Sequence, residues 1–476
     1  MTDLEMIREL LDEAPPSAEV FAEGRQRIAT GSVRSRQPIV HRPRRRSPWL
    51  TSAAAAAGVT LAVSLAAVLG SRVHLGQQAG DVAGRPRPVY VFNWDAGTLT
   101  PISPVTGALG RPVKVGPGAR RIKWYGQWER RMPSIQQNLI LPGGKTDYVV
   151  YLVKDGGEVL RAVSLATGAA GRPIPLGPGA GQMVMAPDGR TAYVLYLARP
   201  GGGTAVRPVS LVTGTVGRPI PLGIAWGGQM AITPDGRTVY VASAHSGAVW
   251  PISTATNTRG RPIRIREASS IVFTSHGRTA WVLGVGSGSG QTATPISTAT
   301  NRRGTPIHVG TRYDQVEFTP NGKTAYDLAL PREVTPISTA TGRAGKPIKL
   351  LGATGMAVTP DSKMVYVVDD NGNGSVVPIS TATNTAGIPI RVSGYRGYPG
   401  PGNIVISPDG RTAYAFTDNV GPHKQIVTPI SIPANTPGRA ITVIARGISI
   451  VVPGDQVVLT DNGIVGGGAA TAPSPA

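Results

Sequence analysis

Residues 230–265 read MAITPDGRTVYVASAHSGAVWPISTATNTRGRPIRI. Four short apolar runs, at 230–233, 239–243, 248–253 and 261–265, are separated by segments rich in Pro, Gly, Asn, Asp and Thr. Each run has the length of a β-strand, and residues of these types favour turns. The stretch therefore predicts a meander of four antiparallel strands.

The same pieces recur along most of the chain. The PDGRT turn and its weaker copies recur at spacings of 40 to 48 residues, beginning at Pro142, Pro187, Pro234, Ser275, Pro320, Pro360, Pro408 and Pro453. The segment PISTATN, which is followed by GRPI, has copies that begin at Pro101, Ala162, Pro208, Pro251, Pro295, Pro336, Pro378 and Pro429. Four strands in each unit of this length is the pattern of propeller blades. We therefore predict an all-β fold, a β-propeller of four-stranded blades at 88–462.

The ends of the repeat region predict how the ring closes. Runs matching strands 2, 3 and 4 lie between Val89 and Val115, before the first inner strand at 137–141. A lone run matching strand 1 lies at 448–452, after the last complete unit. Three strands from one end and one from the other would make a shared blade, so we favour eight blades over seven. The run 457–459 repeats strand 2 and has no assigned place.

Two recurrent prolines need a structural explanation. Pro262 and its equivalents lie in the outermost strand, where a proline discourages edge-to-edge pairing. Pro251 and its equivalents lie in the third strand, where a proline removes a ladder hydrogen bond. We therefore expect a bulge at Pro251, or a third strand that begins there.

The units resemble YVTN-type propeller repeats. The matching pieces are PDGRTVYVAS, AVWPISTATN and RPIRI, and the resemblance covers about Pro88 to Asn462. It implies a propeller but no single function, because that family includes surface-layer, binding and enzymatic members. The chain differs from the family in two respects, since seven blades are commoner there and the Asp of the family's VSVID segment is replaced at Ser253, Ser297, Ser338 and Ser380.

The segment 49–70 is uncharged, rich in alanine and long enough to cross a bilayer as a helix. Eight Arg and no acid lie between Gly24 and Pro48, whereas Arg72 is the only Lys or Arg in the dozen residues after the segment. The positive-inside rule then predicts a single-pass signal anchor in the cell membrane, with the N-terminus cytoplasmic and the propeller extracytoplasmic. A soluble alanine-rich helix and a cleaved signal peptide are the alternatives. Tail, span and propeller together resemble many actinobacterial envelope proteins.

The flanking segments complete the predicted domain organisation. Residues 1–48 are predicted to be a cytoplasmic tail, helical and then Arg-rich, with Thr2 and Glu5 as a capping box for its first helix. These helices could dock a cytoplasmic partner or lie on the membrane. Residues 71–87 are predicted to be a stalk, and 463–476 a disordered tail.

Composition limits the chemistry. The chain has no Cys, which excludes disulfides, thiolate nucleophiles, Cys-ligated zinc and Cys-attached haem. Its six His form no HExxH pair, and no Walker A loop or GxSxG elbow is present. We assign no catalytic residue, no metal ligand and no cofactor. An enzyme is therefore not the favoured interpretation.

The charge suggests an acidic partner. The chain carries a formal net charge of +21, of which residues 71–476 contribute 39 Lys and Arg against 20 acids. The predicted topology places two sets of cations on one face of the propeller. The 1–2 turns carry Lys145, Arg190, Arg237, Arg278, Lys323, Lys363 and Arg411. The 3–4 turns carry Arg111, Arg172, Arg218, Arg261, Lys346 and Arg439. A docking surface for phosphate polymers or lipid headgroups is one interpretation, and duplicated turn sequences with solvated Arg are the other.

The opposite face carries the loops that differ most between repeats. Variable loops on a regular scaffold are common binding sites, and aromatic and Arg side chains are common anchors. The candidate ligand-binding residues there are Trp226, Arg312, Tyr313, Tyr395, Arg396 and Tyr398. We therefore predict a binding or scaffold module for an envelope polymer or protein partner, and nucleic acid is not expected. A transmembrane sensor and a lactonase-like propeller hydrolase are the alternatives.

Overall fold

The structure is a computed structural model. It describes residues 89–465 except at 94, 104–105, 119, 125–127, 133–134, 141–143, 154–156, 197–202, 225–228, 275–276, 286–289, 311–314, 330–332, 370–373, 393–402, 418–423, 445–447, 452–455 and 461–462. The predicted cytoplasmic tail, membrane segment and stalk lie outside the described residues. Within the described residues, no helix has the length and apolar character needed to cross a membrane.

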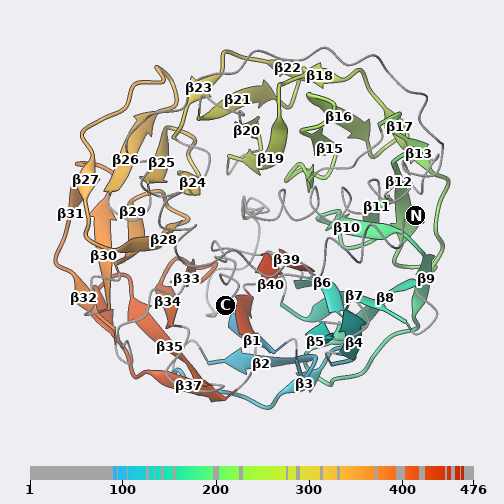
Figure 1. Ribbon diagram of the computed structural model, residues 1–476, viewed down its shortest axis with the longest axis horizontal. Helices are drawn as coiled ribbons and strands as arrows, with labels where there is room; N and C mark the ends of the chain where they lie inside the picture. Colours follow the sequence, from blue (N-terminus) through green and yellow to red (C-terminus); the bar gives the residue numbers. More distant parts are fainter. Residues whose placement is uncertain are drawn as a thin grey trace, which may run out of the picture. The chain divides into compact units, whose positions relative to one another are not determined.

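Eight β-sheets form the blades of a ring, which confirms the all-β fold with eight blades (Figure 1). Blade 1 contains β1 (Val89–Asn93), β2 (Thr98–Ile102), β3 (Val113–Lys114) and β38 (Ile448–Val451). Blade 2 contains β6 (Ile135–Ile140), β7 (Thr146–Leu152), β8 (Glu158–Ser164) and β9 (Ile174–Gly177). Blade 3 contains β10 (Ala180–Met185), β11 (Thr191–Tyr196), β12 (Ala205–Ser210) and β13 (Ile220–Pro221). Blade 4 contains β14 (Met230–Ile232), β15 (Thr238–Ser243), β16 (Ala248–Ser253), β17 (Thr258–Arg259) and β18 (Ile263–Arg264).

The remaining blades repeat this pattern. Blade 5 contains β19 (Ala268–Phe273), β20 (Thr279–Val285), β21 (Gln291–Ser297), β22 (Arg302–Arg303) and β23 (Ile307–His308). Blade 6 contains β24 (Gln315–Phe318), β25 (Thr324–Ala329), β26 (Glu333–Ser338) and β27 (Ile348–Lys349). Blade 7 contains β28 (Ala353–Val358), β29 (Met364–Asp369), β30 (Ser375–Ser380), β31 (Thr385–Ala386) and β32 (Ile390–Arg391). Blade 8 contains β33 (Asn403–Ile406), β34 (Thr412–Thr417), β35 (Lys424–Ser431), β36 (Thr436–Pro437) and β37 (Ile441–Ile444). A separate hairpin, β4 (Arg120–Trp124) with β5 (Trp128–Met132), lies in the chain between blades 1 and 2.

Blade 1 joins the two ends of the propeller. Strand β38 pairs antiparallel with β1, from Tyr90 opposite Val451 to Asn93 opposite Ile448. The inner strand therefore comes from the C-terminal end of the repeats and the other three from the N-terminal end, as predicted from the strand count. This pairing closes the ring.

The C-terminal segment adds two strands to blade 2. Strand β39 (Gln456–Thr460) pairs with the inner strand β6, with Gln456 opposite Leu139, and β40 (Gly463–Val465) pairs with β39. Figure 1 shows both labels inside the ring. An inner strand has one row of backbone groups without a partner strand, and β39 supplies that partner. The run at 457–459, which had no assigned place, thus extends blade 2.

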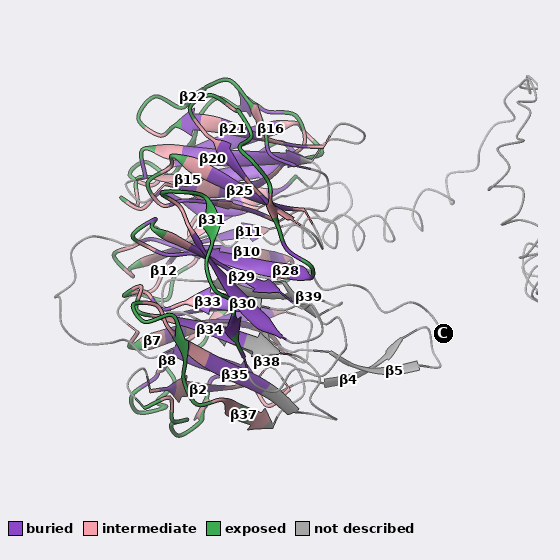
Figure 2. Ribbon diagram, turned by 90° about the vertical axis from the view of Figure 1, so that its left-hand side faces the viewer, coloured by how far each residue is buried: buried purple, intermediate pink, exposed green. Residues whose placement is uncertain are grey.

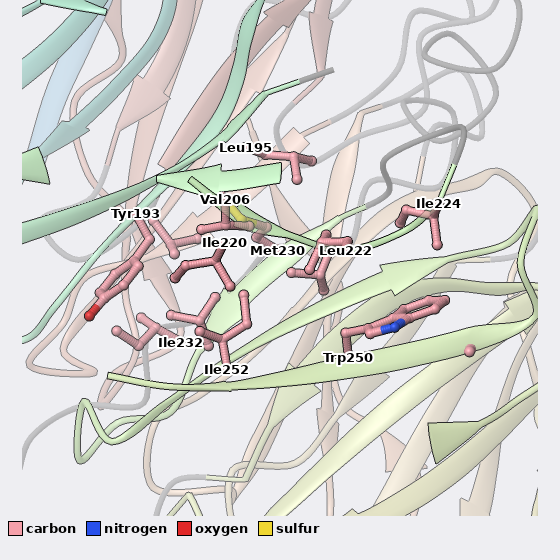
Figure 3. Close-up of a cluster of buried hydrophobic side chains, with 14 of the residues drawn as sticks. Tyr193, Leu195, Val206, Ile220, Leu222, Ile224, Met230, Ile232, Trp250 and Ile252 are labelled. Atoms are coloured by element: carbon pink, nitrogen blue, oxygen red, sulfur yellow. The ribbon is translucent and has the colours of Figure 1, made fainter. Parts of the chain in front are cut away.

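Hydrophobic clusters lie between neighbouring blades. The described residues form eight such clusters, and each combines buried residues of two consecutive blades. Figure 3 shows the cluster between blades 3 and 4, where Tyr193 and Leu195 meet Ile232 and Trp250. In β15, Val239 and Val241 pack toward blade 3, while Tyr240 and Ala242 pack toward blade 5. A strand buried on both sides is mostly apolar, so strand 2 does not alternate between apolar and polar residues.

The expectation that the third strand begins at Pro251 is wrong, whereas an extra residue does interrupt the pairing on the outer side of Pro251, because residues 250–251 lie opposite 260–262. Strand β16 runs through Pro251, which pairs with Tyr240 in an unbroken register. The outer strand is interrupted instead, because β17 and β18 pair with the two ends of β16 and leave a gap between Arg259 and Ile263. The Pro251 carbonyl oxygen, which points to this outer side, accepts from the backbone N–H of Gly260 at 2.8 Å. The missing N–H of Pro251 thus faces the gap.

The glycine of each GRP segment is required by the same contact. A Cβ atom on Gly260 would lie 3.0 Å from Cγ of Pro251, and one on Gly217 would lie 2.8 Å from Cγ of Pro208. Only a residue without a side chain can stack this closely on the proline ring. The recurrent Pro of strand 3 and the recurrent Gly of GRP are therefore one packing unit.

A second link joins each of several blades to the next through a buried tyrosine. The hydroxyl of Tyr326 in blade 6 donates to Oδ1 of Asn384 in blade 7 at 2.6 Å, and Tyr366 donates to Asn435 of blade 8 at 2.6 Å. Asn384 and Asn435 are the last residues of STATN-type turns and have φ values of 54° and 52°. Asn tolerates this left-handed conformation and supplies the acceptor. Where the turn ends in Gly, as at Gly107 or Gly342, the backbone shape is kept but the acceptor is absent.

We expect this hydrogen bond to contribute about 1 kcal/mol to the free energy of unfolding. In a double-mutant cycle of Tyr326→Phe and Asn384→Gly, Gly preserves the positive φ and Phe preserves the packing, so the coupling energy should be close to that value. Urea unfolding measures it. Tyr414→Phe is the matched control, because the equivalent turn residue in blade 1 is Gly107, and it should be nearly neutral. A coupling energy near zero would contradict the assignment.

We also expect closure to depend on β38 rather than on β39 and β40. Ending the chain at residue 446 removes all three strands and leaves β1 without its inner neighbour, whereas ending it at 454 removes only β39 and β40. The shorter chain should lose several degrees of Tm, or its cooperative transition, while the longer one should unfold nearly as the full chain does. Thermal unfolding followed by circular dichroism compares them, and equal Tm values for the two truncations would refute this role of β38.

Candidate functional site

The turn between strands 1 and 2 is held by a small hydrogen-bond network. In blade 4, the Thr233 hydroxyl donates to Oδ1 of Asp235 at 2.6 Å, and that oxygen also accepts from the backbone N–H of Arg237 at 3.0 Å. The Thr238 N–H donates back to the Thr233 hydroxyl at 3.0 Å. Asp side chains stabilise turns in this way, by accepting from the backbone two residues on. The turn geometry leaves the next side chain, Arg237, in solvent.

The same network recurs in other blades. Blade 7 uses Thr359, Asp361 and Lys363, and blade 8 uses Ser407, Asp409 and Arg411. Blade 6 replaces the carboxylate by Asn321, whose side-chain oxygen accepts from the N–H of Lys323. A regular turn thus presents one basic side chain in each of these blades.

We call the seven basic residues of these turns the turn cations. All seven are exposed, and each follows the inner strand of its blade at the same end of that strand: Lys145, Arg190, Arg237, Arg278, Lys323, Lys363 and Arg411. Figure 2 shows exposed turns gathered along one side of the blades, while buried residues fill the middle of the strands. The structure therefore brings the turn cations to one face.

The acids of this face only partly neutralise the turn cations. Arg237 lies 3.8 Å from Asp235 and Lys363 lies 3.7 Å from Asp361, with 86% and 79% of the basic side chains exposed. Exposed pairs of this kind contribute little energy and leave the cation accessible. Partial burial raises the pKa of Asp361. Hydrogen bonds from the Thr359 hydroxyl and the Lys363 N–H, together with the charge of Lys363, outweigh this effect and hold that pKa below its ordinary value.

The other six predicted cations, which we call the edge cations, have a different position. Arg261 does not lie in the turn that follows β16 but in the gap between β17 and β18, the outermost strands of blade 4. The equivalent positions in other blades follow the same Gly, and all are exposed: Arg111, Arg172, Arg218, Lys346 and Arg439. The interruption of the outer strand, which the sequence analysis did not foresee, moves them from the turn face to the outer edge.

The six candidate ligand-binding residues of the variable loops lie outside the described residues: Trp226, Arg312, Tyr313, Tyr395, Arg396 and Tyr398. Their role stays a prediction. On the same side, Asp369 of the DDNGNG loop is buried, and its Oδ1 accepts from the backbone N–H of Gly352 at 2.7 Å. Among the described residues, no group of three His, Asp or Glu side chains is placed to hold a metal ion.

Sequence reasoning missed a set of glutamines on the inner strands. Gln137 of blade 2 donates to the Met183 carbonyl at 2.6 Å and accepts from the Met183 N–H at 2.7 Å in blade 3. Gln182 and Gln315 make the same pair of bonds to Met230 and Met356 of their next blades. Their signal was present, because each Gln stands five residues before the proline of a turn. These side chains connect neighbouring inner strands.

The buried tyrosines also make the stability of the fold depend on pH in the alkaline range. Burial raises the pKa of Tyr193, Tyr240, Tyr326, Tyr366 and Tyr414 to about 12, and the carboxylates of nearby turns add to the rise in all but Tyr326. The folded protein therefore favours the neutral phenols more than the unfolded chain does. Stability from this source is complete below the ordinary pKa of 10 and is lost as pH rises through 12.

We expect the free energy of unfolding to fall between about pH 10 and about pH 12, because the unfolded chain releases these protons first. Urea midpoints across this range, with phenolate absorbance recorded in parallel, measure the effect. Replacing Tyr240 and Tyr414 by Phe should make the fall shallower. An unchanged midpoint up to pH 12 would contradict the expectation.

Comparisons with known proteins support the fold alone. No protein-family model matches the chain, and no curated protein matches it significantly. A solved structure of dihydro-heme d1 dehydrogenase NirN in complex with DHE is similar, with a TM-score of 0.56 and 14% identity over 81% of this chain and 80% of that one. Kuenenia stuttgartiensis hydrazine synthase is also similar, with a TM-score of 0.39 and 24% identity over 53% of this chain and 76% of that one. The first likeness supports an eight-bladed propeller, and neither carries an activity to this chain.

Proposed function

We propose that the chain is a membrane-tethered, extracytoplasmic binding module whose propeller docks an anionic polymer of the cell envelope. The observation that supports this most directly is the set of turn cations. Seven exposed basic side chains stand at the same turn of successive blades, and hydrogen-bonded Asx turns fix the backbone beneath five of them, in blades 3, 4, 6, 7 and 8. A rigid array of like charges raises the local concentration of a polyanion.

A polymer suits this array better than a small anion does. A single exposed cation contributes little to binding, so affinity has to come from several contacts made at once. Charges farther apart than about 8 Å are largely screened at physiological salt. An anion must therefore reach several blades to use the array, and a chain of charged groups can do so.

The tether and the location rest on the sequence. The uncharged segment 49–70 and the Arg-rich stretch before it support a single-pass anchor with the propeller outside the cytoplasm. The lack of Cys is compatible with either side of the membrane. Membership in the YVTN class of repeats likewise rests on the resemblance of the units, which supports a propeller and no particular function.

The purified full-length chain should retain an anionic polymer from an envelope extract at low salt and release it at moderate salt. A variant with Arg190→Glu, Arg237→Glu and Lys363→Glu should lose at least tenfold in affinity. The matched control reverses three edge cations, Arg172, Arg218 and Lys346, and should lose less than threefold. Equal losses of affinity in the two variants would show that the turn face is not the binding surface. Retention that does not change with salt concentration would refute the electrostatic basis of the proposal.

A further inference from the structure

A hollow on the outer edge, between blades 4 and 5, has a different charge from its counterparts. It has a volume of about 470 Å³ and is lined by Arg261 and Arg264 from blade 4 and by Arg302 and Arg303 from blade 5. All four arginines are exposed. Its size suits several linked groups rather than one small ion.

Duplication of the repeat does not explain this concentration of arginine. At the matching positions, blade 2 has Arg172 and Pro175. The segment of blade 3 that faces them has Thr215 and Val216. No other pair of neighbouring blades carries more than two Lys or Arg at these four positions. Three of the four arginines, at 264, 302 and 303, lie outside the common GRP segment, and four basic residues come together only at this pair of blades.

The four arginine side chains have no polar partner among the described residues. None of them makes a hydrogen bond or ion pair with another residue in the part of the chain that the structure describes. Some other cations of the outer edge are engaged: Arg259 donates to the Leu222 carbonyl at 2.5 Å, Lys114 donates to the Ala96 carbonyl at 2.5 Å, and Lys349 pairs with Glu333. The segments 258–266 and 300–308 contain no acid. Their charge is therefore free for a ligand.

The floor of the hollow is fixed. Asn301 lies between the two blades with φ of 55°, and its Oδ1 accepts from the buried Tyr240 hydroxyl of blade 4 at 2.5 Å. Gly260 stacks on Pro251 beneath the other side, with the contact described above. The backbone that carries Arg302 is thereby held against blade 4. A cation on a fixed backbone loses less entropy on binding than one on a mobile loop does.

We propose that this hollow is a binding site for a chain of phosphate groups. Arginine presents a planar fork that binds phosphate oxygens in pairs, and it is less strongly hydrated than lysine. Two arginines on each wall present several such forks to one polymer chain, whose phosphates follow one another along its backbone. The site is distinct from the turn face and does not depend on it, because it lies at the outermost strands.

Binding of inorganic polyphosphate to the purified full-length chain tests the site, with fluorescence anisotropy of a labelled chain as the readout. Arg264→Glu with Arg302→Glu should weaken binding at least tenfold. Arg172→Glu with Arg218→Glu makes the same change in net charge at exposed edge positions and should weaken it less than threefold. Equal effects of the two variants would overturn the site but leave the turn face untouched, and a wild-type chain that binds no polyphosphate would overturn it as well.

A conservative variant separates phosphate recognition from charge alone. Arg302→Lys with Arg303→Lys keeps the charge but removes the forks, and should weaken polyphosphate binding at least threefold. Polyglutamate of equal charge should bind the wild-type chain more weakly, because each of its carboxylates lies at the end of a separate flexible side chain. If polyglutamate binds as well as polyphosphate and both variants affect the two polymers alike, the hollow is a general cationic surface and the proposal for phosphate is wrong.

Discussion

The pairing of β38 with β1 is the constraint on which the rest of the propeller depends. Each blade buries apolar side chains against both neighbours, so eight blades require eight interfaces. A row of blades that did not close would expose two of these surfaces to water, at a cost proportional to their area. Four residue pairs between the two ends of the repeat region remove that exposure. Closure also removes the free ends at which unpaired blades could associate between molecules.

Polar contacts then specify how the blades follow one another. The glutamines of the inner strands and the Tyr–Asn pairs near the turns both reach from one blade into the next. Hydrophobic packing between flat sheets tolerates small shifts, whereas a hydrogen bond of 2.6 Å tolerates few. Buried polar groups of this kind favour one register, because any other register would leave them without partners. The two sets lie at different distances from the centre of the ring and so fix both the inner and the outer part of each blade.

The interrupted outer strand links this architecture to the proposed binding surfaces. Proline in strand 3 and glycine in GRP pack together, and the short outer segments on either side of them leave no long open edge for another sheet. The residue that follows the glycine is held in the gap and faces solvent. Where that residue and its neighbours are arginine, as between blades 4 and 5, the interrupted outer strand both protects the edge and exposes positive charge.

The repeat pattern is enough to predict the four-stranded unit, the number of units and the sharing of one blade between the ends, because these depend on spacing and on the alternation of apolar runs with turns. It also located the turn cations, since a PDGR turn places its Arg in the same position wherever it occurs. Tertiary structure alone decided where Arg261 lies, because the break in the outer strand results from contact between Pro251 and Gly260. It also decided that β39 joins blade 2, which depends on a free inner edge, and that four arginines from two blades surround one hollow. Contacts between separate repeats arise only when the ring forms, so no local pattern records them.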